Sequence, residues 1–251
     1  MRISLNYTKS VEQNASIYFE QAKKAKKQLE GATIALEKSH EKLEKIKPAE
    51  IQKQVIKKKR KIHWFEKFRW FYTNEDMLFI AGRDATTNEI IIKKHTDNHD
   101  IVFHSEMSGS PFGVLKTEGK KPSKEALEEC AVFVACYSKA WKLGLGVMDI
   151  FYVTPDQVTK EAPSGEFIGK GSFMIYGKKT ILSVSLKLYI GKYNDLMMSA
   201  PYLAIKKHCE KYIEIKQGNK KTSDIAKKIK KQFNHDDLDD IVKILPVGSS
   251  L

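Results

Sequence analysis

Apolar and small side chains recur at intervals of four and three residues along the first part of the chain. Ten of the eleven positions in this series are apolar or alanine, which is typical of a heptad seam on a long helix. The series consists of Val11, Ala15, Tyr18, Ala22, Ala25, Leu29, Ala32, Leu36, Ser39, Leu43 and Ile46. Pro48 follows and ends the predicted helix, because proline cannot continue one.

A second and shorter apolar rhythm follows at Ile51, Val55 and Ile62, with lysines at most other positions. One solution is a helical hairpin with antiparallel arms. Pairing with another chain is the other solution, because a long apolar seam is not expected to stay exposed to water. We therefore expect a coiled-coil helical arm over residues 1–61.

An aromatic block comes next, and cations are interleaved with its rings. Seven of the ten positions from His63 to Tyr72 are aromatic, and five cations, residues 57–61, precede the block. Bulky rings in a run more often fill a core, whereas the cations between them can hold phosphate. We expect a division, with most rings buried and Trp64 or Phe65 near the surface beside Lys67 and Arg69.

The middle of the chain alternates between strand-like and helix-like segments. Asp84 is expected to cap a helix that runs to about His95, although Ile90 to Ile92 would also suit a strand, and Ser123 caps a helix that ends before Gly144. The predicted strands are 77–81, 101–104, 112–115, 149–154, 172–176 and 181–190. This pattern predicts an α+β domain over residues 62–204, with a mixed sheet and packed helices.

The tail changes character and predicts a small helical appendage over residues 205–251. Ser223 opens a lysine-rich amphipathic helix with Ile225, Ile229 and Phe233 on one side. A second short helix is expected from Asp236 to about Leu245, before Pro246, Val247 and Gly248 end it.

The net charge of +13 is concentrated in two flanking segments. Residues 1–61 carry a surplus of +9 and residues 205–231 a surplus of +7, whereas residues 62–204 are neutral and the last twenty carry −3. That distribution suits a polyanionic partner such as RNA, although solvated lysine-rich helices are the simpler alternative. The chain has no apolar run of the ~18 residues that span a bilayer and no signal peptide, so we expect a cytoplasmic protein without membrane contact.

Two groups of polar residues could carry chemistry. Gly82, Arg83 and Asp84 lie between a predicted strand and a predicted helix start, where backbone amides and an arginine can bind phosphate, or where they form an ordinary capped turn. A second group could bind a metal, but it lies in a polar connection without ligand spacing, and a solvated loop is the simpler interpretation. Its members are His95, Asp97, His99, Asp100 and His104. His104 ends a strand, so base stacking, phosphate contact or a core role are open to it.

The sequence lacks the patterns of common enzymes and cofactor sites. It contains no phosphate-binding glycine loop, Ser164 has no His and Asp partners at informative spacing, and the three cysteines lack zinc-site spacing. We therefore expect reduced cysteines, no enzyme activity, no cofactor and no metal.

Several ordered motifs of this chain resemble the RNA-binding domain of the NFACT family of ribosome-associated quality-control factors, some of which are known as fibronectin-binding protein A. The resemblance covers about residues 62–185. It rests on residues 63–71, Gly82 to Ala85, Asn88-Glu89, Lys93-Lys94, Asp100 to His104, Ser138 to Trp141, Gln157-Val158, 162–166, Gly171 to Ile175 and Gly177 to Lys179. The segment from Asn14 to Lys26 is similar to the family's coiled-coil arm, and Leu238 to Pro246 is similar to archaeal tails.

The resemblance implies a protein that binds the stalled large ribosomal subunit and contacts tRNA. The family's large N-terminal domain and helix-hairpin-helix segment do not match any part of this sequence, which leaves tRNA selection and tail synthesis open. The chain departs from the family pattern at Ser108, Thr86-Thr87 and Glu161. We expect an archaeal-type short member of the family or an excised piece of a longer one.

The sequence therefore favours a non-enzymatic RNA-binding module, with tRNA, large-subunit rRNA and the large subunit as partners. The residues expected to contact phosphate are Lys67, Arg69, Arg83, Lys93, Lys94, Lys178 and Lys179, with Trp64 and His104 stacking or positioning. One alternative is a protein-interaction adaptor that uses the coiled coil to bind a partner or itself, with incidental RNA binding. The other is a metal-dependent nuclease around His104 and Asp100.

Overall fold

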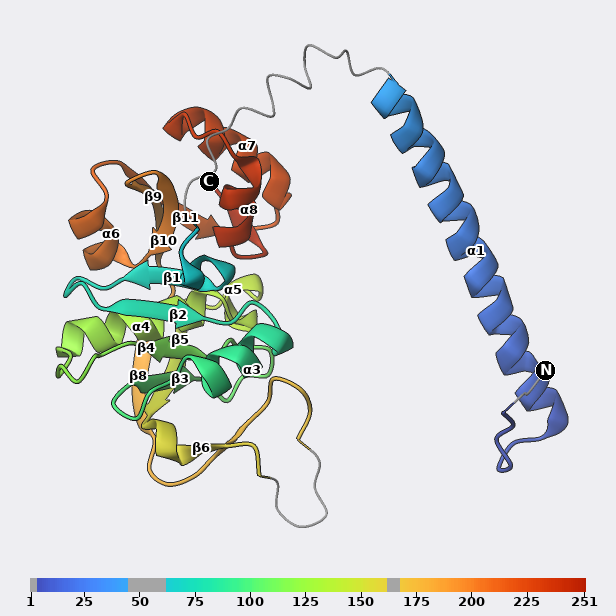
Figure 1. Cartoon of the computed structure of the whole chain (residues 1–251), viewed down its shortest axis with the longest axis horizontal. Coiled ribbons are helices and arrows are strands. Elements are labelled where there is room, and N and C mark those ends of the chain that lie inside the picture. Colours follow the sequence, from blue (N-terminus) through green and yellow to red (C-terminus); the bar gives the residue numbers. More distant parts are fainter. Residues whose placement is uncertain (1–3, 45–61, 162–167) are drawn as a thin grey trace. The chain divides into compact units, whose positions relative to one another are not determined.

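The computed structural model describes residues 4–44, 62–161 and 168–251 of the chain (Figure 1). The chain divides into two compact units, residues 1–61 and 62–251. The α-helices are α1 (Val11–Glu44), α3 (Ala85–Lys94), α4 (Lys124–Cys136), α5 (Lys139–Lys142), α6 (Tyr202–His208), α7 (Thr222–Phe233) and α8 (Leu238–Ile244), and the 3₁₀ turns are η1 (Trp64–Lys67) and η2 (Pro155–Gln157). None of the described helices is long and apolar enough to cross a membrane.

The strands fall into one large sheet, one smaller sheet and one short ribbon. They are β1 (Arg69–Tyr72), β2 (Leu78–Ala81), β3 (Ile101–His104), β4 (Gly113–Leu115), β5 (Val147–Val153), β6 (Val158–Thr159), β7 (Met174–Ile175), β8 (Thr180–Ser185), β9 (Leu188–Tyr193), β10 (Leu196–Ala200), β11 (Tyr212–Gln217) and β12 (Ser249–Ser250). The order is β1-β2-β4-β3-β5-β8 in the six-stranded sheet and β10-β9-β11-β12 in the four-stranded sheet, while β6 pairs with β7.

The first unit contains α1, a helix of 34 residues, as the heptad series predicted. Its seam stays open to solvent, since Val11, Leu29 and Leu36 are largely exposed. The second apolar rhythm at Ile51 and Val55 lies outside the described residues, as does the predicted helix end at Pro48. Pairing of the seam, within a hairpin or with another chain, therefore stays a prediction.

The second unit has the predicted α+β class, but the prediction of a mixed sheet was wrong. Every strand pairing among the described residues is antiparallel. The physical reason is the connectivity: β1 and β2 are joined by a turn at residues 73–77, and β3 and β4 by a loop, whereas a parallel pair needs a longer crossover.

Two predicted elements are each divided in the structure. The segment 181–190 is not one strand, because it bends at Leu186 and Lys187 into β8 of the large sheet and β9 of the small one. The helix predicted from Ser123 stops at Cys136, where the Ser138 hydroxyl donates to the Ala135 carbonyl at 2.7 Å and accepts from the Ala140 amide at 3.1 Å. Ser138 thereby caps α5, so the chain turns there.

The aromatic block is mostly core, as expected. Phe65, Phe68, Trp70 and Phe71 are buried, whereas Trp64 is 47% exposed. Helix α4 packs across β3, β4, β5 and β8, and α3 packs against β2 and β4. These contacts place the sheet, α3 and α4 around one apolar core.

The tail belongs to the same core. Ile225, Ile229 and Phe233 of α7 are buried, which confirms the predicted amphipathic face. Helix α6 spans residues 202–208, so the boundary proposed between residues 204 and 205 falls inside a helix. Strands β11 and β12 were not predicted, and they tie the tail to the small sheet.

Candidate nucleic-acid interface

The second unit contains a cleft of about 490 Å³, which we call the Arg69 cleft. It lies where the start of α3, the end of β3 and the end of α4 converge with the segment from Lys170 to Phe173. The lining residues used below are Arg69, Gly82, Arg83, Asp84, Asn88, His104, Phe112, Tyr137, Lys170 and Phe173. The predicted contacts Arg69, Arg83 and His104 therefore meet at one place.

Arg69 and Arg83 are held by backbone carbonyls and an aromatic ring. Arg83 donates through Nη2 to the Phe68 carbonyl at 2.9 Å and to the Glu66 carbonyl at 3.2 Å. Arg69 donates to the Gly82 carbonyl, and its guanidinium lies 4.6 Å from the centre of the Tyr137 ring. The two Nε atoms are buried and have no hydrogen-bond partner.

The charges of these two arginines are poorly compensated. Burial lowers the pKa of both Arg69 and Arg83, but arginine stays protonated in proteins. Within residues 4–44, 62–161 and 168–251, no salt bridge joins either guanidinium to a carboxylate. Asp84 is the nearby acid, yet its Oδ1 accepts from the Thr87 amide at 2.8 Å, so it is engaged in capping α3. The cleft therefore presents a net positive charge.

His104 forms part of the cleft wall as a neutral ring. It stacks on Phe112 with 3.8 Å between ring centroids and a 6° interplanar angle. Its Nδ1 lies 3.0 Å from the Pro111 carbonyl, to which it donates, so Nε2 is left as an acceptor. Burial lowers the pKa of His104, and the ring is neutral at pH 7. His104 thus supplies a flat surface and an acceptor, without a positive charge.

Glu89 and Lys160 fix the far wall of the cleft against α3. The Lys160 ammonium donates to the Gly169 carbonyl at 2.8 Å, and Glu89 accepts from the Gly171 amide at 3.0 Å. Gly171 has φ +75°, and an added Cβ would lie 2.4 Å from the Ala85 backbone, so only glycine fits. The wall brings the exposed side chain of Lys170 to the rim.

The remaining predicted contacts lie elsewhere. Trp64 stacks on His95 at 4.7 Å and the Lys67 ammonium lies 3.2 Å from His95 Nε2, which puts both at the C-terminal end of α3, roughly 15 Å from its cleft end. Lys93 pairs with Glu89 at 2.6 Å. This bond is the main reason that the pKa of Glu89 is lowered to about 2. Lys94 and Lys178 are exposed, and Lys179 pairs with Glu106 at 2.5 Å.

Asn88, Tyr137 and Lys170 are among the lining residues that were not predicted as contacts. Asn88 Oδ1 accepts from the Phe112 amide at 3.2 Å and lies so close to Gly82 that a Cβ there would be 1.8 Å away. The sequence feature that could have pointed to these residues is the set of glycines at 82, 169 and 171, because each precedes or flanks a residue that lines the cleft.

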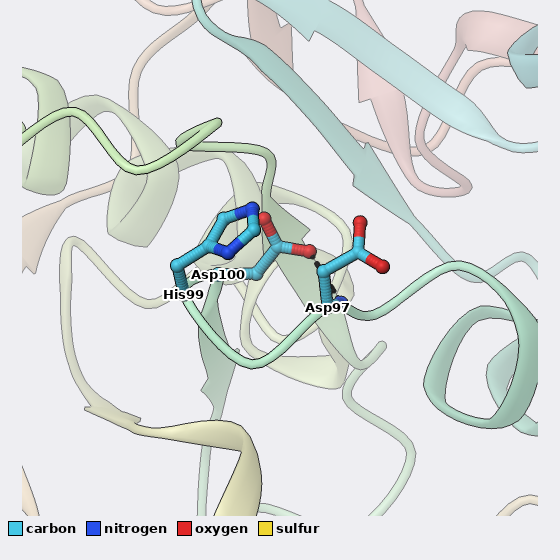
Figure 2. A group of neighbouring side chains, drawn as sticks. All are labelled: Asp97, His99 and Asp100. Carbon is cyan, nitrogen blue, oxygen red and sulfur yellow. Dashed lines mark hydrogen bonds between the residues drawn. The ribbon is translucent and has the colours of Figure 1, made fainter.

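The carboxylates of Asp97 and Asp100, which belong to the group considered as a metal site, are paired with a lysine. Figure 2 shows Asp97, His99 and Asp100 side by side, with the Asp97 amide donating to Asp100 at 2.8 Å. The Lys116 ammonium binds Asp97 at 2.6 Å and also binds the buried Asp100. Asp100 precedes β3 and His104 ends it, so the two residues of the nuclease hypothesis lie roughly 13 Å apart along the strand. The structure does not bring them together.

Comparison with known proteins identifies the central part of the second unit. Residues 67–177 match the family model described as the NFACT protein RNA binding domain. The archaeal Rqc2 homolog aRqcH of Methanocaldococcus jannaschii is 42% identical over 203 residues, which are 78% of this chain and 30% of that protein. The ribosome quality control complex subunit NEMF of Homo sapiens is 40% identical over 178 residues, 68% of this chain and 16% of that protein.

A solved structure is also similar, at a lower level. It is the C-terminal part of the fibronectin/fibrinogen-binding protein from Streptococcus suis, with 21% identity, a TM-score of 0.40, and coverage of 69% of this chain and 76% of that one. A likeness at that level carries no conclusion about fold or function. The chain spans less than a third of the length of the curated relatives named above.

Proposed function

This chain is a member of the NFACT family, and from that premise we propose that it binds RNA in ribosome-associated quality control, with the Arg69 cleft as the phosphate-binding site. The names of its archaeal and human relatives support the role in ribosome quality control. The finer part of the proposal is that tRNA or large-subunit rRNA is the RNA bound, on the large ribosomal subunit.

One observation carries the proposal: two partly buried guanidiniums face one cleft with no carboxylate paired to either within the described residues. Taking a positive charge out of water without a counter-charge is costly, so such a site favours an anion. Guanidinium groups bind phosphate oxygens through charge-assisted and often bidentate hydrogen bonds. The partly exposed rings of Phe173 and the neutral His104 add flat surfaces on which a base can stack.

Binding of labelled RNA to the full chain, measured by fluorescence anisotropy, tests the proposal. We expect Arg83→Gln to weaken binding by about 2 kcal/mol, or about 30-fold, because a charge-assisted bond is lost. Lys170→Gln should weaken binding less. Lys170 is exposed at the rim, so this substitution is not expected to disturb the fold. Lys120→Gln is the matched control, since α4 separates it from the cleft by roughly 20 Å.

The outcome that would contradict the proposal is equal affinity of the wild type, the Arg83 variant and the Lys170 variant. Melting temperatures of all variants are measured alongside, so that unfolding is not read as lost binding. Co-sedimentation with large and small ribosomal subunits then tests the finer part of the proposal, which predicts association with the large subunit.

A second candidate function, a protein-interaction adaptor, is favoured by the exposed apolar seam of α1. Deleting residues 1–47 separates the two candidates. Loss of ribosome association with intact RNA binding would support the adaptor role, whereas retained ribosome association would support RNA binding as the anchor.

A further inference from the structure

We infer that the C-terminal segment at Pro246 and Val247 completes a second nucleotide subsite beside the Arg69 cleft, so that single-stranded RNA lies across Arg69 with consecutive nucleotides on either side. This inference deepens the proposed function and rests on it. It adds residues beyond the segment 67–177 that the RNA-binding family model matches.

A second hollow of about 310 Å³ adjoins the cleft, and we call it the Val247 hollow. Arg69 and Tyr137 line both, as does the loop at Ser108 and Gly109. The residues that line the hollow alone include Lys139 and Lys142 of α5 and Pro246 and Val247 of the tail. Because the Arg69 guanidinium lies on Tyr137, this stacked pair forms the shared boundary.

The tail is fixed in place by hydrogen bonds to α4 and α5. The Trp141 indole donates to the Ser249 hydroxyl at 3.1 Å, and that hydroxyl donates to the Pro246 carbonyl at 2.7 Å. The Tyr137 hydroxyl donates to the Ile244 carbonyl. These bonds hold the wall of the hollow against the helices that carry the lysines.

A backbone contact adds to this. Gly248 has φ +87°, and an added Cβ there would lie 3.2 Å from Lys142 Cα, so the tail and α5 approach closely at a position that favours glycine. The hollow is therefore formed by ordered and tethered segments of the described chain.

The chemistry of the hollow is that of an amphipathic anion such as a nucleotide. Val247 is 68% exposed, and with Pro246 it offers an apolar wall for a ribose or base. Lys139 and Lys142 are exposed and Arg69 lies at the boundary, and none of the described residues that line the hollow carries a carboxylate. Cations that follow the backbone beside apolar or aromatic surfaces are the general arrangement for binding single strands.

Two separate concavities favour a single strand over a duplex. Each hollow can accept a nucleotide that is splayed away from its neighbour, whereas duplex RNA is recognised mostly by its shape and by 2′-OH and phosphate contacts across its minor groove. The guanidinium between the hollows is positioned to meet the phosphate that links the two nucleotides.

The test compares ligands of different length on full-length variants. The ligands are uridine monophosphate, a single-stranded hexanucleotide and an RNA duplex, and affinities are measured by calorimetry and anisotropy. The key variant is Lys139→Gln with Lys142→Gln, and Val247→Glu is a second variant at an exposed side chain. The matched control is Lys120→Gln with Lys121→Gln, which removes the same charge at the other end of α4.

We expect the key variant to bind the hexanucleotide on the order of tenfold more weakly and to reduce the salt slope by about 1.4, since each lost phosphate contact on a single strand contributes about 0.7. Val247→Glu should also weaken the hexanucleotide, while both variants bind the mononucleotide as the wild type does. Unchanged hexanucleotide affinity in both variants, or an equal loss in the control, would overturn the inference.

Other outcomes separate this inference from the proposed function. If Arg83→Gln weakens binding while the Lys139 and Lys142 variant binds as the wild type does, the second subsite is contradicted and the cleft is supported. If Arg83→Gln is silent as well, the proposed function falls. Equal binding of duplex and hexanucleotide, weakened alike by the key variant, would overturn the single-strand assignment.

Discussion

The two ends of β3 carry polar clusters of opposite kinds. At its start, Asp100 is buried and its charge is met by the Lys116 ammonium, with Asp97 bound to the same lysine at 2.6 Å. At its end, His104 opens onto a cleft in which Arg69 and Arg83 have no carboxylate paired to them within the described residues. The charge of the first cluster is thus neutralised by an ion pair within the protein, whereas the charge of the second is not.

Polar groups that stabilise the fold have their charge paired within the protein, whereas those available to a ligand do not. Asp100 also accepts from the amides of Asp97 and Thr117, so its hydrogen-bonding capacity is used within the protein. The guanidiniums use carbonyl acceptors, which hold them in place without cancelling their charge. Sequence composition cannot make this distinction, because both clusters contain charged residues beside histidines.

The largest expected effect is on stability at the closed end. Asp100→Ala should lower the free energy of unfolding by about 3–5 kcal/mol, because it leaves the Lys116 charge without its buried partner. Urea denaturation measures the loss. Asp97→Ala is the control, since its carboxylate is mostly exposed and such pairs contribute about 0–1 kcal/mol.

An equal loss of stability in the Asp97 and Asp100 variants would contradict the assignment of Asp100 to the fold. Loss of RNA binding by a folded Asp100→Ala variant would contradict it as well, because this cluster would then take part in recognition.

Glu129 of α4 is a second buried carboxylate, and unlike Asp100 it is paired to no described ammonium. Its Oε2 accepts from the Asn74 amide at 2.9 Å, yet burial raises its pKa to about 7. The folded state thus holds a proton that the unfolded state releases near pH 4.5. The stability from this proton is full below about pH 4.5 and is lost as the pH rises to about 7.

Glu129→Gln should remove that pH dependence. At pH 8 the free energy of unfolding of the variant should exceed that of the wild type by up to about 3 kcal/mol, because the pKa differs by about 2.5 units between the folded and unfolded states and each unit is worth about 1.36 kcal/mol. Denaturation curves at pH 5 and pH 8 measure it. If the free energy of unfolding changed equally with pH in the wild type and the variant, Glu129 would be ionised in the folded protein and the prediction would be wrong.

The smallest expected effect is that of added metal. Because Lys116 already binds Asp97 and Asp100, millimolar Mn²⁺ or Mg²⁺ should leave the melting temperature unchanged and support no RNA cleavage. The control is the same measurement in chelator. A rise of several degrees with metal, or cleavage that chelator stops, would restore the metal-dependent nuclease.

Local features of the fold could be predicted from the sequence because they depend on neighbouring residues. Asp84 capped α3 as expected and His95 ended it, and the apolar face of α7 at Ile225, Ile229 and Phe233 is buried as expected. The sequence left Trp64 or Phe65 as the ring near the surface, and the structure exposes Trp64 and buries Phe65.

The candidate site could be predicted only in part, because its contacts join distant segments. Arg69 binds the carbonyl of Gly82, Glu89 binds the amide of Gly171, and the Tyr137 hydroxyl reaches the carbonyl of Ile244. No local pattern encodes these pairings, so Lys170 and Tyr137 were missed. Trp64 and Lys67 were predicted as RNA contacts together with Arg69 and Arg83, but they do not line the cleft.

We expect RNA to enter the cleft that holds the guanidiniums of Arg69 and Arg83. The most direct measurement is photocrosslinking of the full chain to single-stranded RNA that contains 4-thiouridine, followed by mass spectrometry of the crosslinked peptides. We expect crosslinks at Lys170 or Phe173, which line the cleft and are not buried. Crosslinks confined to the lysine-rich helix α7, with none in cleft peptides, would contradict it.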